Sequence, residues 1–325
     1  MKISIVILNW NGKKDTLECL SSLKNLTYKE YDIIVVDNGS SDGSPQEIAS
    51  AFPEALLLCQ DTNLGFAGGC NVGIRYALDK GAEAICLLNN DAVVDPHFLS
   101  ALAEKARKEP QTGILGAQIL MYSDRERLDH LGGMWNAKRA AFDLIGNRTL
   151  CKDLIWDESQ EIDYVCGASF FVKREVFEKV GLLEEKFFLI WEEADLCFQA
   201  RRQGFSIKVC LEAKIFHKVS ASFKSKAHST YFFFRNRLLW MKRNLPPKEY
   251  ERIYQTILFP EIRHNNKMLL LKSVQALIQR VFLQRPLSRM QKEKMLKYKA
   301  VRQAYRDYKE ERYGQGPLWI YQTFT

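Results

Sequence analysis

The first hundred residues alternate between short aliphatic runs and segments with helical spacing. Ile3–Leu8 is a continuous, largely β-branched run, which is typical of a strand buried on both faces of a parallel sheet. The segment from Asp15 to Leu26 follows with leucines at helical spacing. Further strands are expected at 33–36, 55–59 and 84–88, and further helices at 44–51 and 68–80. Because such alternation forms βαβ units, the sequence predicts an α/β fold with a mostly parallel sheet flanked by helices.

Polar residues follow four of the predicted strands, at 9–11, 37–41, 60–65 and 89–91. In parallel sheets, ligands bind beyond the carboxyl ends of the strands. Four strand ends that carry polar, glycine-rich or acidic residues therefore predict one ligand site at that edge of the sheet.

The carboxylate of Asp91 follows the strand at 84–88, in the sequence Asn89-Asn90-Asp91. A carboxylate at this position can hold a divalent cation that neutralises a diphosphate. An ordinary turn accounts for the same residues, since Asn and Asp are common where strands end. His217 ends an apolar run. It completes a metal shell only if Asp91 already holds the ion, and is otherwise a structural hydrogen-bonding residue.

Three acids, Glu192, Glu193 and Asp195, follow the aromatic run 187–191. Carboxylates crowded in this way repel one another, which raises a pKa toward the range useful for a general base. An acidic helix N-terminus is the alternative, because the helix dipole favours negative charge there.

Two glycine-containing segments follow predicted strands. Asp37 opens the segment 37–43, where it can accept a hydrogen bond from a base imide or form a plain turn and helix cap. The segment 63–71 has glycines ahead of a helix, which superficially suggests a phosphate cradle. It contains neither GxxxxGK[ST] nor GxGxxG, so kinase-like and NAD-binding functions have no motif support.

Charge is unevenly distributed along a chain of ordinary globular composition. Residues 241–325 carry 18 basic and 7 acidic side chains, which favours an anionic partner such as a membrane surface, a lipid-linked phosphate or nucleic acid. A solvated helix face is the equal alternative. The helical spacing of Tyr298, Tyr305 and Tyr308 favours a packed helix face over nucleic-acid stacking.

Eight cysteines occur without a CxxC pair, which predicts buried free thiols in a reducing compartment. No secretory signal and no stretch long enough to span a bilayer is visible. We therefore expect a cytoplasmic protein, with any membrane contact being peripheral.

In their order and spacing these motifs resemble those of the family 2 glycosyltransferases, especially the bacterial rhamnosyltransferase-like branch that builds cell-surface polysaccharides. The resemblance extends from Ile3 to about Asn244. It implies a GT-A fold and the inverting transfer of a sugar from a nucleotide diphosphate to an acceptor hydroxyl. The matching strings are 6–11, 35–40, 63–71, 88–91, Gly167-Ala168, Phe187-Phe188, 191–196, His217 and Arg235-Asn236.

The resemblance also implies a role for each matching residue. Asp91 is the metal-contacting carboxylate of the family's DXD element, and His217 joins it on Mg²⁺ or Mn²⁺. Glu193 is the catalytic base of the family's ED motif, and Asp195 orients it or the acceptor. The expected acceptor-binding residues are Gly167, Ala168, Trp191 and Glu192. The expected donor-binding residues are Leu8, Asn9, Asn11, Asp37, Asn38, Asn63, Gly65, Phe66, Gly68, Asn71, Asn89 and Asn90, with Asp37 reading a pyrimidine base.

Two positions depart from the family pattern. The DXD element is Asn-Asn-Asp, so fewer negative charges are present to hold the metal ion. The ED motif is Glu-Glu, which leaves Glu192 and Asp195 as alternative bases. A nucleotidyltransferase and a non-catalytic sugar-nucleotide or glycan-binding module remain the competing functions.

The sequence predicts two domains. Residues 1–230 form the catalytic domain, with a donor-binding half at about 1–117 and an acceptor-binding half at about 118–230. Residues 231–325 form a basic helical extension that contacts an anionic membrane surface or another subunit. The first expectation for the donor is dTDP-rhamnose, and for the acceptor a glycan or lipid-linked hydroxyl.

Overall fold

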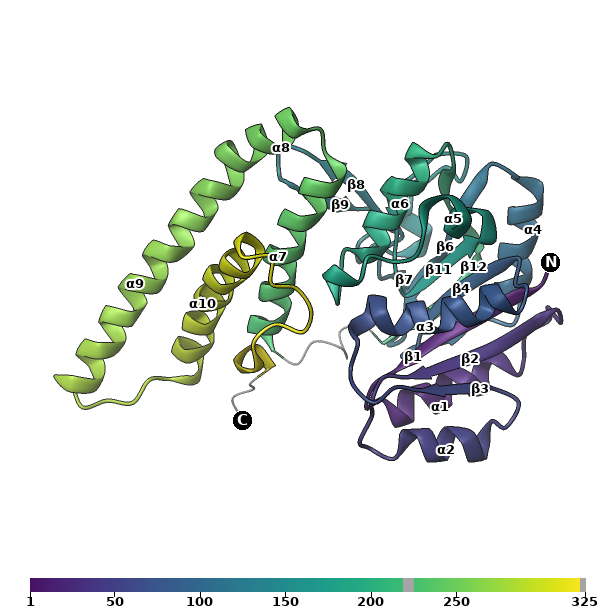
Figure 1. The fold of residues 1–325 in the computed structure, drawn as a ribbon, viewed down its shortest axis with the longest axis horizontal. Coiled ribbons are helices and arrows are strands. Elements are labelled where there is room, and N and C mark those ends of the chain that lie inside the picture. The colour runs from purple at the N-terminus through teal and green to yellow at the C-terminus, as the bar shows by residue number, and fades with distance from the viewer. Residues whose placement is uncertain (219–224, 322–325) are drawn as a thin grey trace. The chain divides into compact units, whose positions relative to one another are not determined.

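The computed structural model describes residues 1–218 and 225–321, which divide into two compact units (Figure 1). The first unit takes in Met1–Trp135, Phe142–Phe188 and the chain from Glu192 to the end of its last strand. The second takes in Asn136–Ala141, Leu189–Trp191 and the helices from 226 onward.

The first unit is built on a nine-stranded sheet in the order β3-β2-β1-β4-β11-β6-β12-β5, with β7 paired to β6. Strands β3, β2, β1, β4, β6 and β12 run in one direction, while β11, β5 and β7 oppose them. A smaller sheet has the order β10-β8-β9. The strands are β1 Ile3–Asn9, β2 Tyr31–Asp37, β3 Leu56–Cys59, β4 Ala84–Asn89, β5 Ala92–Val94, β6 Thr112–Met121, β7 Asp124–Leu128, β8 Gly132–Asn136, β9 Ala141–Leu144, β10 Tyr164–Val165, β11 Ser169–Lys173 and β12 Ser206–His217.

Helices cover both faces of the main sheet (Figure 1). The face that bears Ile3, Ile5 and Ile7 shares a buried core with residues of α1 and α4. The opposite face of β1 packs against α3, as the alternation of side chains along a strand requires. This confirms the predicted α/β architecture. The helices of this unit are α1 Lys13–Leu23, α2 Ser44–Ala51, α3 Gly65–Asp79, α4 Phe98–Lys108, α5 Arg174–Val180 and α6 Glu192–Arg202, with short 3₁₀ turns at Cys151–Asp153 and Glu185–Phe187.

The glycine-rich segment belongs to helix α3, which begins at Gly65 and not at the predicted residue 68. A Cβ on Gly69 would lie 2.4 Å from the Leu8 side chain, and a Cβ on Gly73 would lie 2.5 Å from Val6. These two glycines therefore let α3 approach β1 closely. The phosphate cradle that the segment superficially suggests is instead the first turns of a helix packed on the sheet.

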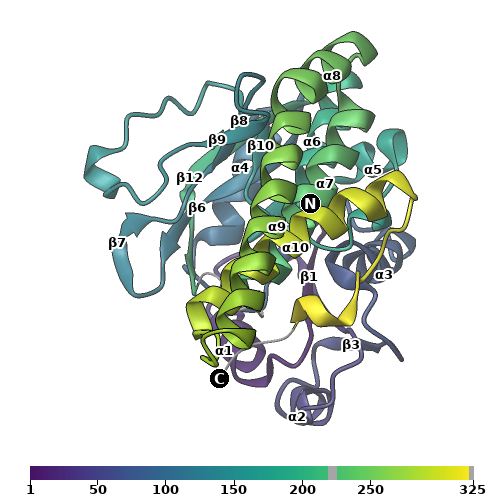
Figure 2. The same ribbon diagram turned by 90° about the vertical axis from the view of Figure 1, so that its left-hand side faces the viewer.

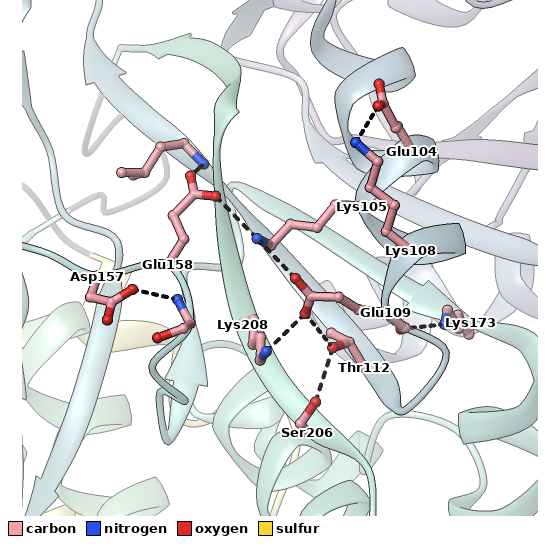
Figure 3. Close-up of polar contacts among 12 residues, drawn as sticks. Glu104, Lys105, Lys108, Glu109, Thr112, Asp157, Glu158, Lys173, Ser206 and Lys208 are labelled. Carbon is pink, nitrogen blue, oxygen red and sulfur yellow. Dashed lines mark hydrogen bonds and ion pairs between the residues drawn. The ribbon is translucent and has the colours of Figure 1, made fainter.

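An ion-pair network joins the end of α4 to β12 and to the segment before β10 (Figure 3). The Glu109 carboxylate contacts Lys105 at 3.3 Å and Lys208 at 2.9 Å, and it accepts a hydrogen bond from Thr112 at 3.1 Å. Lys105 also binds Glu158 at 3.0 Å. The network fixes the long connection that leads into β10.

The second unit is mainly helical, and its first helix, α7, begins at Lys226, five residues before the helical extension expected from the sequence. Helix α10 contacts both α7 and α9, and lies between them in Figure 1. Tyr305 and Tyr308 pair through their hydroxyls with Tyr254 and Tyr250, which confirms for these two the predicted packed helix face. The elements are α7 Lys226–Asn244, α8 Pro247–Ile253, a π-helical turn Tyr254–Leu258, α9 Phe259–Val281, α10 Arg289–Lys309 and a 3₁₀ turn Leu318–Tyr321.

All eight cysteines are free thiols, as predicted. Six are buried, whereas Cys59 is exposed and Cys151 is half-buried, so burial was predicted wrongly for these two. Within residues 1–218 and 225–321, no helix combines the length and apolar character needed to cross a bilayer.

Candidate active site

The ends of β1 and β2 meet through buried polar side chains. The Asn9 amide donates to Asp37 Oδ1 at 2.6 Å and to Ser44 Oγ at 2.7 Å. The other oxygen of Asp37 accepts from the Ser40 backbone N–H at 3.0 Å. Asn9 is fully buried and Asp37 is 2% exposed. The two predicted donor-binding residues therefore form one rigid unit at the carboxyl edge of the sheet.

Thr16 extends this unit to the end of β4. Its hydroxyl donates to Asn9 Oδ1 at 2.8 Å, and its oxygen accepts from the Asn90 amide at 2.9 Å. A Cβ on Gly12 would lie 2.4 Å from that amide. The structure thus brings the ends of β1, β2 and β4 together, as the strand-end argument predicted. Thr16 was missed because nothing in its helical pattern marks it.

Asn11 and Leu8 flank Asn9. Asn11 has φ of 51°, a left-handed conformation that Asn tolerates better than most residues. Its side-chain oxygen accepts from the Ser41 backbone at 2.7 Å. Leu8 faces helix α3 at Gly69.

Asn38 ties the end of β2 to the loop before α3. Its amide donates to Asn63 Oδ1 at 2.9 Å and to the Gly65 carbonyl at 3.0 Å, and its oxygen accepts from Leu64 N–H at 2.9 Å. Asn63 in turn accepts from Gly65 N–H at 2.8 Å. These bonds satisfy donors at the start of α3 that the helix itself cannot.

The first turn of α3 also contacts the segment at Phe188. Gly65 has φ of 77°, and a Cβ there would lie 2.5 Å from the Phe188 ring and carbonyl. The Phe66 N–H donates to that carbonyl at 2.5 Å. A Cβ on Gly68 would lie 3.0 Å from Leu64. Gly65 is therefore required by both conformation and space.

Asn71 was predicted to bind the donor. Its side chain is buried and makes hydrogen bonds to other parts of the protein. Its amide donates to the Leu183 carbonyl and to Glu185, both at 2.9 Å, and its oxygen accepts from Leu183 N–H at 3.1 Å. The structure shows Asn71 as a bridge between α3 and the chain that precedes α6.

Asp91 and His217 face one another across the β5–β12 edge. His217 Nε2 lies 3.2 Å from Asp91 Oδ1, and 3.4 Å from the Asn89 amide. Strand pairing explains this approach, because His217 is the register partner of Ala92. The two residues predicted as metal ligands are thus adjacent, although 126 positions separate them in the sequence.

Asp129, which the sequence did not indicate, holds the other nitrogen of His217. Its Oδ2 lies 3.1 Å from Nδ1, and Asp129 is 6% exposed. Burial lowers the pKa of His217, but hydrogen bonds to Asp129 and Asp91 outweigh burial and raise it to about 10. Burial alone raises the pKa of Asp129, yet the bond to His217 and nearby histidine charge bring it below its usual value. His217 is therefore fixed between two carboxylates.

Glu193 lies beside Gly167, where no side chain intervenes. A Cβ on Gly167 would stand 3.6 Å from the Glu193 carboxyl carbon. The next residue, Ala168, accepts a hydrogen bond from Asn89 N–H at 3.1 Å, which connects this position to the end of β4. Burial raises the pKa of Tyr164 well above its usual value, and the Glu193 charge adds to that shift. Glu193 therefore lies beside the turn that joins β10 to β11.

The other two acids of α6 are more deeply buried, Glu192 at 4% and Asp195 at 3% exposure. Burial raises the pKa of Cys70 in α3, and the Glu192 charge contributes to the shift. Glu192 therefore lies near α3. Consecutive helical residues point about 100° apart, which explains why Glu192 and Glu193 have different surroundings.

Trp191 belongs to the second unit, with its ring 5.8 Å from that of Phe233 and 5.6 Å from that of Trp240. Asn236 of α7 donates to the carbonyls of Leu189 and Ile190 at 2.7 and 2.9 Å. Both Ile190 and Trp191 have positive φ, which costs roughly 1–3 kcal/mol per residue. The Asn236 amide thus stabilises strained backbone directly before α6. The part of the Trp191 ring that Phe233 and Trp240 cover cannot contact an acceptor sugar.

Comparison with solved structures identifies the class of fold. The mannosyltransferase PcManGT of Pyrobaculum calidifontis, solved with GDP-Man and Mn²⁺, has a TM-score of 0.57 at 14% identity, covering 96% of this chain and 88% of that one. Residues 1–349 of TarS from S. aureus give 0.54 at 14% identity, covering 96% and 93%. The fold is the GT-A fold of glycosyltransferases, as predicted.

Sequence comparison identifies the family. The profile described as "Glycosyl transferase family 2" matches residues 4–181, and the chain belongs to this family. It is a glycosyltransferase, which decides against the nucleotidyltransferase and binding-module alternatives.

Three curated relatives have related names. The low-salt glycan biosynthesis hexosyltransferase Agl10 of Haloferax volcanii is 27% identical, covering 79% of this chain and 80% of its own. The N-acetylglucosaminyl-diphospho-decaprenol L-rhamnosyltransferase of Mycobacterium tuberculosis is 26% identical, covering 65% and 72%. The dTDP-rhamnosyl transferase RfbF of Shigella flexneri is 24% identical, covering 75% and 81%.

Proposed function

We propose that this glycosyltransferase moves L-rhamnose from dTDP-rhamnose to a hydroxyl of a cell-surface glycan or lipid-linked acceptor, with inversion at the anomeric carbon. The observation that carries the proposal is the position of Glu193 over Gly167, one residue from the backbone bond that joins Ala168 to Asn89. A candidate base thus stands next to the strand end that bears Asp91. The two relatives named as rhamnosyltransferases support the choice of sugar.

The reaction is a single displacement. The Glu193 carboxylate takes the proton of the acceptor hydroxyl as the acceptor oxygen bonds to the anomeric carbon. The bond from that carbon to the diphosphate breaks, and its electron pair leaves with the nucleotide. Attack opposite to the leaving group inverts the anomeric centre.

The pair Asp91 and His217 could hold a divalent cation, which would take the place of the proton now shared between them. One carboxylate oxygen and one imidazole nitrogen approach each other, and Asp129 fixes the imidazole from behind, as supporting carboxylates do at metal-bound histidines. Among the described residues, no group of three or more His, Cys, Asp or Glu side chains is arranged to hold an ion alone. A bound cation would stabilise the charge of the departing diphosphate. A mixed oxygen and nitrogen pair suits Mn²⁺ better than Mg²⁺, which prefers oxygen ligands.

Donor recognition is proposed for the edge formed by Asn9, Asp37 and Asn38, within residues 1–117. Each Asp37 oxygen accepts one hydrogen bond from the protein, and a carboxylate oxygen has a second lone pair that can accept from a base imide. Acceptor recognition is proposed for residues 118–230, which contain Gly167 and Glu193.

The test is calorimetric titration of dTDP-rhamnose, UDP-glucose, UDP-galactose, UDP-N-acetylglucosamine and GDP-mannose, each with and without Mn²⁺. We expect dTDP-rhamnose to bind and Mn²⁺ to strengthen its binding. Transfer is then measured onto an N-acetylglucosaminyl diphospholipid. Strong binding of GDP-mannose alone, or transfer of glucose, galactose or N-acetylglucosamine in preference to rhamnose, would contradict the proposed donor.

Replacing Asp129 by asparagine tests the support of the metal pair. The variant keeps the size of the side chain but removes the charge that holds His217 at 3.1 Å. Because supporting residues of this kind typically contribute about 10- to 100-fold in metal affinity, we expect Mn²⁺ to bind more weakly by that factor. Free Mn²⁺ is measured by electron paramagnetic resonance without any donor.

Asp124→Asn is the matched control, since Asp124 is a half-buried carboxylate on β7 that binds Arg127. It removes the same charge without touching His217, so its Mn²⁺ affinity should match that of the unmodified protein. An equal loss in both variants would mean that overall charge, and not support of His217, is responsible.

A further inference from the structure

The distal half of α9 and the two residues that follow it carry an exposed apolar face in the second unit. Leucine, valine and phenylalanine side chains there are 58–76% exposed, at Leu270, Leu277, Val281, Phe282 and Leu283. Leu271, Val274 and Ile278 are exposed beside them. Positions 270, 274, 277 and 281 recur every three or four residues, so they form one stripe along the helix.

This stripe points away from the hairpin partner α10. Ala276 is buried, and Gln279 accepts from the Gln291 amide of α10 at 2.8 Å. On a helical projection, 276 and 279 lie across the helix from 270, 274 and 281. The apolar stripe is therefore not part of the core of its own unit. Figures 1 and 2 show α9 and α10 side by side, joined at the end remote from α8.

The same end of the hairpin is strongly basic. Residues 267–299 carry nine lysines and arginines and one acid, Glu293. Three arginines, Arg280, Arg285 and Arg289, stand at or next to the connection that holds Phe282 and Leu283. An apolar face bordered by cations matches the chemistry of an anionic bilayer surface, where acyl chains lie beneath negative headgroups.

A groove lies between α9 and α10. Its size helps to decide whether the hairpin encloses a single lipid molecule or contacts a membrane surface. The groove is lined by Ala276, Leu287, Met290 and Met295, with Lys272 and Lys294 among its polar residues. Its volume is about 120 Å³, well below the roughly 300–1,000 Å³ of sites that enclose a drug-sized ligand. The groove cannot enclose a whole lipid, which favours contact with an extended surface.

We propose that the α9–α10 hairpin docks on an anionic membrane, with Phe282, Leu283 and the α9 stripe inserted among the acyl chains. A second copy of this chain fits less well, because two such faces would bring like charges together. This inference rests on the proposed function in one respect: membrane docking would place the enzyme where a lipid-linked acceptor lies. Vesicle binding requires neither donor nor acceptor, so the two proposals fail separately.

The test is co-sedimentation of the full chain with vesicles of phosphatidylcholine, with and without phosphatidylglycerol. We expect binding to the anionic vesicles, weakened by high salt. Replacing both Phe282 and Leu283 by serine removes two apolar side chains from the contact, and should lower the partition coefficient about tenfold or more. Replacing Arg280, Arg285 and Arg289 by glutamine should lower it for the anionic vesicles only.

The matched control is Ile155→Ser, which removes a 97% exposed apolar side chain from the first unit and should leave binding unchanged. All substituted side chains are exposed, so thermal unfolding should be unaffected. Binding to neither vesicle, or an equal loss in the Ile155 variant, would overturn the proposal. So would binding that only the charge variant reduces, since that contact needs no apolar face. Self-association abolished by the Phe282/Leu283 variant, without vesicle binding, would assign the face to a second copy.

Discussion

Replacing Glu193 by glutamine is expected to lower kcat/KM for sugar transfer by about 10²- to 10⁴-fold, the usual contribution of a general base. Glutamine has the same shape but takes no proton at neutral pH. The donor dissociation constant, measured by calorimetry, should stay unchanged, because the role proposed for Glu193 is at the acceptor and not at the nucleotide. A variant that loses donor affinity in parallel with turnover would place Glu193 in the donor site.

The neighbouring acids supply the controls for this prediction. Glu192 is buried near Cys70 of α3, whereas Glu193 stands beside Gly167. Glu192→Gln and Asp195→Asn should therefore change stability more than transfer, as followed by urea unfolding and by initial rates. If Glu193→Gln turns over normally while one of these two loses activity, the base is that residue. This comparison settles the ambiguity left by the Glu-Glu form of the motif.

The first half of the fold was predictable because its signal is local. Strand β1 was expected at Ile3–Leu8 and lies at Ile3–Asn9, and helix α2 lies at the predicted 44–51. Apolar periodicity and strand-end polarity are written within a few residues of each element. The start of α3 was predicted less accurately, at residue 68 and not at Gly65. Glycines are typical of loops, but here they allow the helix to pack closely against Leu8 and Val6.

Site residues that directly follow a predicted strand could be predicted from the sequence. Residues that reach the site only through contacts between distant segments could not. Asn9, Asp37 and Asn90 lie in one hydrogen-bonded chain through Thr16. Asp129 was missed because its contact with His217 spans 88 residues and its segment has no clear periodicity.

Replacing Asp91 by asparagine should have the second large effect. The carboxylate supplies the negative charge of the Asp91–His217 pair, and losing a preorganised electrostatic partner of a developing charge typically lowers kcat by about 10²- to 10³-fold. We expect that loss, together with loss of the Mn²⁺-dependent increase in donor affinity in calorimetry. Asp79→Asn, at the exposed end of α3, is the control for charge alone and should behave as the unmodified protein. Mn²⁺-enhanced donor binding that survives in Asp91→Asn would remove Asp91 from the metal site.

A double-mutant cycle then tests whether Asp91 and His217 serve the same ion. Their side chains lie 3.2 Å apart, and residues in contact that share a partner give strongly non-additive effects. Once Asp91→Asn has removed the ion, His217→Ala has little left to remove, so the double variant should bind the donor about as well as Asp91→Asn alone. Additive losses would mean two independent roles, with His217 acting on the diphosphate or the fold directly. The cycle therefore separates a shared metal site from two residues that are merely neighbours.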